Sequence, residues 1–249
     1  IGQVKKIQRS DVIKFVKKHY LPERMVISSV GNYTLKKLVN YLNKYFEDNS
    51  SLVQTQKRSV PNKVLAKDTI VDKEIYQSHM VLGGRGFSAS HPSKNSLLLV
   101  NNLLGGPAMN SRMNLSIREK YGLTYMLESN CTIYSDCGSF SVYFASDPKN
   151  TEKVEHLIHK ELLKLCNVKL GNIQLSQAKK QVKGQLAISM ENSLGVMLAH
   201  GKSKLIFNKV DTLDKVLNDF EKITSSQILE VANEIMHPEK LFKLIYQAK

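Results

Sequence analysis

The fold of this chain is decided by the stretch that begins Gly105-Gly106-Pro107 and ends Arg118-Glu119-Lys120-Tyr121-Gly122-Leu123-Thr124-Tyr125. It opens with two glycines, which take backbone angles closed to other residues and let a neighbouring chain approach. The apolar residues that follow predict an amphipathic helix, and Gly122 is suited to end it as the residue just past the C-terminus. The stretch therefore predicts a loop, a helix, and a turn that leads into a strand beginning at Tyr125.

Arg118 and Tyr125 are candidate functional residues because this geometry can bring them to one place. Arg118 falls in the last turn of the predicted helix, where a cation suits the helix dipole. A guanidinium offers a fixed fork of donors, and a phenol offers one directional hydroxyl. Spacing alone favours a surface ion pair for Arg118 and a Tyr125 ring packed on a sheet.

The same stretch resembles the second half of insulinase-like zinc metallopeptidases, of the pitrilysin and processing-peptidase type. The likeness continues through the hairpin Tyr134-Ser135-Asp136-Cys137-Gly138-Ser139-Phe140 and the turn Ser146-Asp147-Pro148, and it covers nearly the whole chain. In that family the matching Arg and Tyr reach across to the zinc site and hold the substrate backbone. The resemblance also implies a substrate-contact loop at Gly105 and Gly106, although a simple helix C-cap explains the two glycines as well.

The zinc motif of that family is absent from this sequence. Family members bind zinc through His-x-x-Glu-His on a helix of their first half. None of the seven histidines belongs to such a motif; they are His19, His79, His91, His156, His159, His200 and His237. We therefore expect no metal ligands and no catalytic residues in this chain, and expect the zinc in an N-terminal domain outside it.

Composition excludes several other classes of function. The net charge of +14 is carried mainly by lysines that are spread along the chain. No nucleic-acid-binding motif accompanies them, so we expect a lysine-rich solvated surface rather than a DNA or RNA partner. No apolar run approaches the roughly 20 residues of a membrane span. The three cysteines are too few, and odd in number, for a disulfide framework, which favours a reducing, cytoplasmic location.

The resemblance implies an α+β fold, with an antiparallel sheet packed with helices, and hydrophobic periodicity predicts where its elements lie. We expect strands at 25–30, 69–71, 76–84 and 241–246, and a hairpin formed by 123–134 and 139–146. We expect helices at 10–20, 34–46, 93–104, 110–121, 151–166, 174–190, 193–207 and 212–220. A Ser-, Gln- and Pro-containing segment at 51–67 is typical of a linker.

An internal repeat indicates how the chain is organised. The segment from Ser10 to Val26 aligns without gaps with the segment from Ser226 to Phe242, and Pro238 lies 216 positions after Pro22. Two copies of one closing unit imply two similar domains of roughly 200 residues. We therefore expect residues 1–50 to be the tail of a first domain that is mostly missing, and residues 68–249 to be a complete second, non-zinc-binding domain.

Taken with the resemblance, these features predict the C-terminal, substrate-gripping half of a zinc endopeptidase, inactive on its own. The implied partners are a peptide substrate and either its own N-terminal catalytic domain or a homologous subunit, and we expect a homo-oligomer. The alternative is a non-catalytic peptide-binding or scaffold subunit of a processing-peptidase-like complex.

Overall fold

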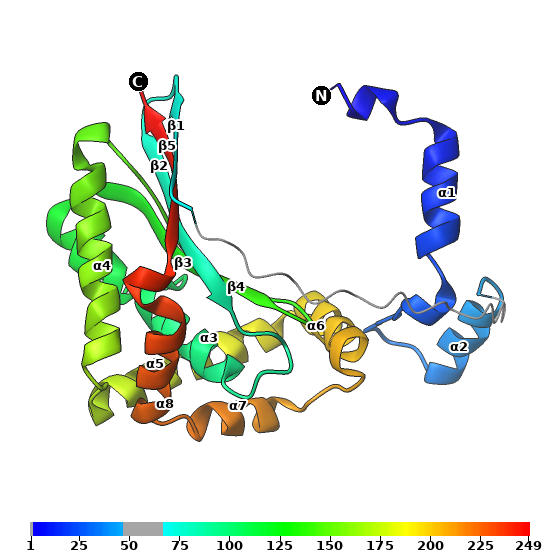
Figure 1. Ribbon diagram of the computed structural model, residues 1–249. Coiled ribbons are helices and arrows are strands. Elements are labelled where there is room, and N and C mark those ends of the chain that lie inside the picture. Colours follow the sequence, from blue (N-terminus) through cyan, green and yellow to red (C-terminus); the bar gives the residue numbers. More distant parts are fainter. Residues whose placement is uncertain (1, 47–66) are drawn as a thin grey trace. The chain divides into compact units, whose positions relative to one another are not determined.

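The structure, a computed structural model, describes residues 2–46 and 67–249. The chain forms two compact units. The first comprises residues 1–59 and 187–211, and the second comprises residues 60–186 and 212–249. Almost all of the predicted linker at 51–67 lies outside the described residues. The chain is coloured along its length in Figure 1.

The first unit is made of helices whose side chains stay accessible. It contains α1 (Arg9–His19), α2 (Leu35–Asn43) and α6 (Ser193–Phe207), and none of the residues in these helices is buried. The α2 helix starts at Thr34, whose hydroxyl accepts from the backbone N–H of Lys37. A segment far away in sequence is tied to α6, because the Ser28 hydroxyl donates to the Met197 carbonyl at 2.7 Å.

The second unit is built on a five-stranded sheet with the order β1-β5-β2-β4-β3. The central strands pair antiparallel, and β1 pairs parallel with β5. Because β3 is the last strand in this order, one of its edges has no strand partner in the sheet. The strands are β1 (Thr69–Lys73), β2 (Ser78–Gly86), β3 (Thr124–Ile133), β4 (Gly138–Ser146) and β5 (Phe242–Ala248).

Helices pack on this sheet, with α3 against β3 and α4 against β4, and Figure 1 shows α4 beside the sheet. The α-helices are α3 (Lys94–Gly105), α4 (Thr151–Asn167), α5 (Asn172–Glu191, which continues into the first unit), α7 (Leu213–Glu221) and α8 (Ser225–Val231). The described residues also contain two π-helical segments, Asn114–Glu119 and Ala232–Met236. Single 3-10 turns occur at Val4–Lys6, Pro22–Arg24, Pro148–Asn150 and Pro238–Lys240.

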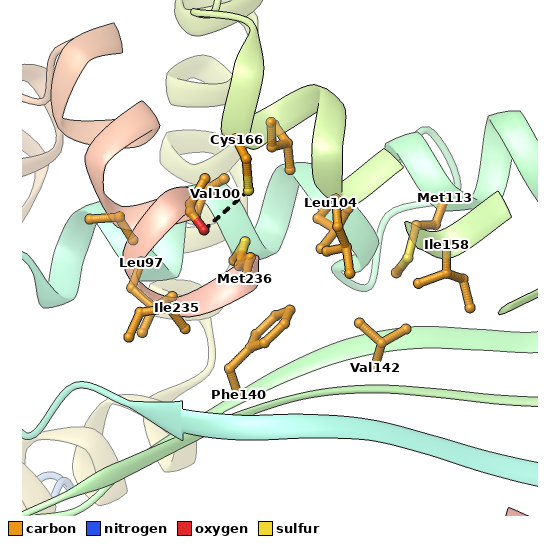
Figure 2. Packing of buried hydrophobic residues seen from close by; sticks show 14 of the residues in the cluster. Leu97, Val100, Leu104, Met113, Phe140, Val142, Ile158, Cys166, Ile235 and Met236 are labelled. Carbon is orange, nitrogen blue, oxygen red and sulfur yellow. Dashed lines mark hydrogen bonds between the residues drawn. The ribbon is translucent and has the colours of Figure 1, made fainter. Parts of the chain in front are cut away.

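The core lies between the sheet and these helices. Phe140, Val142 and Phe144 alternate along β4 and are fully buried, as strand geometry requires of side chains that share one face. Figure 2 shows Phe140 and Val142 projecting from the strand toward Val100, Leu104 and Met236 on the helices. Fully burying a side chain of this size contributes roughly 1.5–3 kcal/mol, so this layer is the main source of stability.

The predicted α+β class is confirmed, with two corrections to the strands. The sheet is mixed rather than wholly antiparallel, because β5 lies parallel to β1 at the sheet end opposite β3. Residues 25–30, predicted as a strand, are not assigned to one. A strand requires a hydrogen-bonding neighbour, and in the described residues nothing pairs with this segment.

The sequence repeat has a structural counterpart. The 3-10 turn Pro22–Arg24 and the 3-10 turn Pro238–Lys240 fall at equivalent positions, and each follows a helix. The residues after the two turns, Met25 and Leu241, both have extended backbones, with ψ 143° in each. The two copies therefore share local geometry, although only the second continues into a paired strand.

Candidate functional site

Arg118 lies on the π-helical segment Asn114–Glu119, inside the helix predicted at 110–121. π-helical segments are rare in proteins, and those that occur are often found at functional sites. The helix ends where the Gly122 N–H donates to the Arg118 carbonyl at 2.9 Å. Gly122 has φ +62°, the left-handed conformation predicted for a glycine that ends a helix.

Tyr125 is turned outward by a β-bulge. Thr124 pairs with Ser146 and Met126 pairs with Ala145, so Tyr125 has no opposite residue on β4. The Thr124 hydroxyl fixes the bulge, because its one hydrogen is shared between the carbonyls of Ala145, at 2.6 Å, and Met126, at 2.8 Å. Bulges commonly re-aim a side chain near functional sites, and the Tyr125 side chain is 86% exposed here.

Arg118 and Tyr125 line the same hollow, of about 560 Å³, which we call the Arg–Tyr hollow. It lies where the helix end meets the start of β3. Its walls are formed by Gln77, Met109, Arg118, Glu119, Gly122, Leu123, Thr124, Tyr125 and Asp147. The hollow thus combines a guanidinium and a phenol with two carboxylates.

Glu119 orients the guanidinium of Arg118. Its Oε1 atom lies 3.0 Å from Nε and 2.9 Å from Nη2 of Arg118. Because one carboxylate oxygen takes both donors, the rest of the guanidinium keeps donors for another acceptor. The Arg118 side chain remains 25% exposed, so a ligand in the hollow can reach it.

Gly105 and Gly106 lie in a different hollow, farther along β3. This glycine hollow, of about 330 Å³, is formed by Leu98, Asn101, Asn102, Gly105, Gly106, Pro107, Glu128, Ser129, Asn130, Cys131, Val182 and Phe220. Tyr125 and Ser129 are four positions apart on the strand, or about 13 Å at the rise of a β-strand. The structure therefore brings Arg118 and Tyr125 together and separates them from the two glycines.

Close packing explains why these two positions are glycine. A Cβ on Gly105 would lie 2.9 Å from the backbone N of Ser129 on β3. A Cβ on Gly106 would lie 2.7 Å from the Asn102 carbonyl of its own helix. Gly105 thus lets α3 pack tightly against β3, and Gly106 lets the chain turn closely past the last turn of α3, whether or not a ligand enters the hollow.

Polar groups in the glycine hollow tie α3 to the edge strand. The Asn101 side-chain amide donates to the Ser129 carbonyl at 3.2 Å, and the Ser129 hydroxyl donates to the Asn101 carbonyl at 3.1 Å. Burial raises the pKa of the Cys131 thiol to about 12, so the thiol stays protonated at neutral pH. Glu128 is the one carboxylate among the residues that line this hollow.

Within residues 2–46 and 67–249, no group of three or more His, Cys, Asp or Glu side chains could hold a metal ion. The three cysteines, all in the second unit, carry thiols rather than a disulfide. No helix in the described part of the chain is long and apolar enough to span a membrane.

Sequence reasoning did not identify three features of the site. Asp147 follows the end of β4, and Gln77 precedes the start of β2. Because these two strands pair antiparallel, both residues lie at the same end of the sheet, where they line the Arg–Tyr hollow. Glu119 is adjacent to Arg118 in the sequence, but adjacency alone does not show whether its carboxylate orients the guanidinium. The bulge at Tyr125 has a local signal only in Thr124, whose hydroxyl can bond nearby carbonyls.

Comparisons with known proteins agree with the resemblance. The uncharacterized zinc protease YmxG of Bacillus subtilis is 27% identical over 235 residues, covering 93% of this chain and 56% of YmxG. An uncharacterized zinc protease of Streptomyces coelicolor is 24% identical over 245 residues, covering 95% of this chain and 53% of that protein. The chain therefore spans about half the length of the curated relatives it matches.

Solved structures show the same fold. A protease from Helicobacter pylori superposes with a TM-score of 0.81 at 19% identity, covering 99% of this chain and 60% of the other. A chain of complex III from Candida albicans superposes with a TM-score of 0.80 at 16% identity, covering 98% and 60%. The model of the peptidase M16 inactive domain matches residues 6–182. This chain belongs to the family of peptidase M16 inactive domains.

Proposed function

We propose that this chain is the substrate-gripping half of a zinc-dependent endopeptidase and is inactive without its zinc-binding half. The observation that carries the proposal is the Arg–Tyr hollow, where Arg118 and Tyr125 face one space. Family membership supports it, because the matching model is that of the inactive domain of a peptidase family. The catalytic zinc and its ligands are assigned to the other half.

Arg118 and Tyr125 supply what peptide hydrolysis needs besides the metal. When bound in the other half, zinc activates a water for attack on the peptide carbonyl. The developing negative charge requires donors that are already in position. Arg118 provides a charged donor that Glu119 holds in place, and Tyr125 provides a hydroxyl that the bulge directs away from the sheet.

The open edge of β3 provides a surface along which a peptide can lie. An extended peptide can add to a sheet edge through main-chain hydrogen bonds, while adjacent hollows accept its side chains. The Ser129 carbonyl is already bonded by Asn101. We therefore place the peptide on the part of the edge between Tyr125 and Ser129, with the Arg–Tyr hollow at one end and the glycine hollow at the other.

A peptidase assay tests this role. The chain is assayed on a fluorogenic peptide together with a zinc-binding M16 half, supplied in one polypeptide or as a separate subunit. Tyr125→Phe is expected to lower kcat about 10²-fold, because one oxyanion donor is lost. Arg118→Lys is expected to be impaired as well, because lysine keeps the charge but loses the planar fork.

Tyr134→Phe is the matched control. Tyr134 follows β3 at its far end and is also exposed, but it lines neither hollow. The loss of the Tyr134 hydroxyl in this variant should leave kcat unchanged. Equal activity for wild type, Tyr125→Phe and Arg118→Lys would refute the gripping role.

The alternative function is a non-catalytic peptide-binding or scaffold subunit. The similarity to a chain of complex III favours it, since that chain is part of a multisubunit assembly. A scaffold would show no peptidase activity with any zinc-binding half, yet would still co-purify with a partner subunit. Homo-oligomer formation and a cytoplasmic location stay predictions, which size-exclusion chromatography with light scattering and cell fractionation would test.

A further inference from the structure

The first unit contains one helix, α6, whose neighbours in the sequence belong to the second unit. Residues 60–186 and 212–249 form the second unit, whereas α6 lies in the first. It packs against Ser28, because the Ser28 hydroxyl donates to the Met197 carbonyl and a Cβ on Gly201 would lie 3.1 Å from the Ser28 Cβ. Ser28 is half-buried, while the other residues of the segment 25–30 are exposed. A helix from the second half of the chain thus covers one side of this segment.

The sequence repeat identifies the matching place in the second unit. The offset of 216 positions that relates Pro22 to Pro238 also relates Ser28 to Leu244, in the middle of β5. Leu244 is one of the residues that line a hollow of about 470 Å³, which we call the sheet-face hollow. The side of β5 that corresponds to the helix-covered side of segment 25–30 therefore faces this hollow.

The sheet-face hollow lies on the side of the sheet opposite to the core. Its floor is one row of side chains across three strands, because Val81 pairs with Leu244 on β5 and with Tyr143 on β4. These side chains are half-buried or exposed. The adjacent row, which alternates to the other side, is fully or almost fully buried and consists of Met80, Phe144 and Ile245.

The lining of the sheet-face hollow suits apolar side chains. The His79 ring nitrogen Nδ1 and the Tyr143 hydroxyl lie 2.8 Å apart, so these two polar atoms are bonded to each other. Val81 and Leu244 add aliphatic surface, and no Asp or Glu is among the described residues that line the hollow. An apolar sheet face of this kind is normally buried against another layer of secondary structure.

The repeat also shows that the first unit has the apolar surface of a domain whose other layers lie elsewhere. In the second copy, α8 and the π-helical segment after it pack against α3, α4 and β2. Four of their buried residues correspond to apolar residues that are exposed on and just after α1. The pairs are Ile228 and Val12, Val231 and Phe15, Ala232 and Val16, and Met236 and Tyr20. The two copies therefore carry the same packing surface, and the first copy is incomplete within the described residues.

We propose that the sheet-face hollow binds one helix of the zinc-binding half, namely the counterpart of α6 in the first copy of the repeat. The same offset places this counterpart ahead of Ile1. The two copies then exchange one helix each: α6 covers segment 25–30, and the counterpart of α6 covers β5 at Leu244. The inference rests on the proposed function only in taking the zinc-binding half as the partner.

Thiol labelling of Leu244→Cys tests the proposal. Leu244 is 37% exposed, so the new thiol should react readily in the chain alone. Adding a zinc-binding M16 half should slow labelling at position 244 at least about tenfold, because a packed side chain is reached only when the interface opens. Peptide mass spectrometry separates this label from those on the natural cysteines. Val168→Cys, at an exposed position after α4 and outside the hollow, should react at the same rate with and without the half.

A photoreactive benzophenone attached to the same thiol identifies what covers the hollow. We expect it to capture a helix of the zinc-binding half. Equal labelling with and without the half would overturn the proposal, as would capture of a second copy of this chain. Should Leu244→Cys fail to fold, Tyr246→Cys, on the same side of β5, gives the same test.

This experiment is independent of the peptidase assay. Protection of position 244 by a half that cleaves no peptide would refute the peptidase role and leave the helix exchange standing. Peptide cleavage that depends on Tyr125, without protection at position 244, would do the reverse.

Discussion

The two hollows along β3 differ in how they are held in place. In the glycine hollow, Gly105 and Ser129 are buried, and the backbones of α3 and β3 approach so closely that a single carbon added to Gly105 collides with the Ser129 backbone of β3. In the Arg–Tyr hollow, Tyr125 projects into solvent and Arg118 is held by the carboxylate of Glu119. The glycine hollow is therefore formed by core packing, whereas the Arg–Tyr hollow is formed by exposed side chains on an ordered backbone.

This difference separates stability from function. Substitution of a tightly packed residue usually lowers the unfolding free energy, whereas substitution of an exposed side chain on an ordered backbone changes it little. We therefore expect substitutions in the glycine hollow to lower mainly the unfolding free energy. Substitutions of Arg118 and Tyr125 should change only how the substrate is bound and cleaved.

The largest effect is expected for Gly105→Ala. Its new Cβ would lie 2.1 Å from the Met113 Cε atom and 2.9 Å from the Ser129 backbone N. The methionine end can move, but the strand backbone cannot, so we expect a loss of about 3 kcal/mol of unfolding free energy. Urea denaturation followed by circular dichroism measures this loss.

Gly184→Ala is the control for this substitution. A Cβ at Gly184, inside α5, meets no atom within 4 Å. It should stabilise the helix by up to about 1 kcal/mol, because alanine has the higher helix propensity. If the two variants lost equal stability, the glycine hollow would not be the packed region described above.

Two thiols, that of Cys131 in the glycine hollow and that of Cys166 on α4, make the unfolding free energy fall at alkaline pH. Burial raises the pKa of Cys131 to about 12 and that of Cys166 to about 11, from an ordinary value of 9.0. The unfolded chain therefore loses these protons first. Their contribution is complete below about pH 9 and is lost as the pH rises through the raised pKa values, by about 1.4 kcal/mol per pH unit for each thiol.

We expect Cys131 alone to account for about 2 kcal/mol of lost unfolding free energy between pH 9 and pH 10.5. Denaturation curves across this interval measure the loss, and Cys131→Ala should flatten the curve relative to wild type. An unchanged slope in Cys131→Ala would show that the thiol titrates normally.

A smaller effect is expected at Gly122, which shapes the backbone of the Arg–Tyr hollow. Its φ of +62° is disfavoured for residues that carry a Cβ, although no atom lies within 4 Å of the position. Gly122→Ala should therefore cost about 1 kcal/mol from backbone conformation alone. Gly122→Asn should cost less, since asparagine tolerates the left-handed region better than alanine. Thermal unfolding distinguishes the two, and equal costs would argue against this conformation.

Local sequence patterns were sufficient to predict most elements of the fold. The alternation of Phe140, Val142 and Phe144 indicates that these side chains share one face of β4, which is the buried face, and Gly122 indicates the helix end. These features depend on neighbours within a few residues. The parallel pairing of β1 with β5 could not be predicted this way, because it joins residues about 175 positions apart.

Residues 25–30 also show that a strand depends on a pairing partner that is distant in the sequence. Their repeat partner, which begins β5, lies between β1 and β2 and becomes a strand. Residues 25–30 follow an equivalent turn, but no strand in the described residues pairs with them. Sequence pattern alone therefore predicts the turn in both copies, while the strand depends on a sheet being present.

The grouping of site residues was predicted only in part. Arg118 and Tyr125 share a hollow because a helix end, a glycine turn and a strand start follow one another in the chain. The separation of Gly105 and Gly106 from them depends on where α3 docks along β3, which no local pattern encodes.

The smallest effect on stability is expected for Tyr125→Phe, and it gives the sharpest contrast with Gly105→Ala. The Tyr125 side chain is 86% exposed and lies opposite no β4 residue, so its hydroxyl contributes little to folding. Unfolding free energy should stay within about 0.5 kcal/mol of wild type. Turnover with a zinc-binding half should still fall about 10²-fold. A Tyr125→Phe protein that lost stability and activity together would mean that the bulge depends on the phenol. The Arg–Tyr hollow would then be a packed feature like the glycine hollow, and the separation between them would not hold.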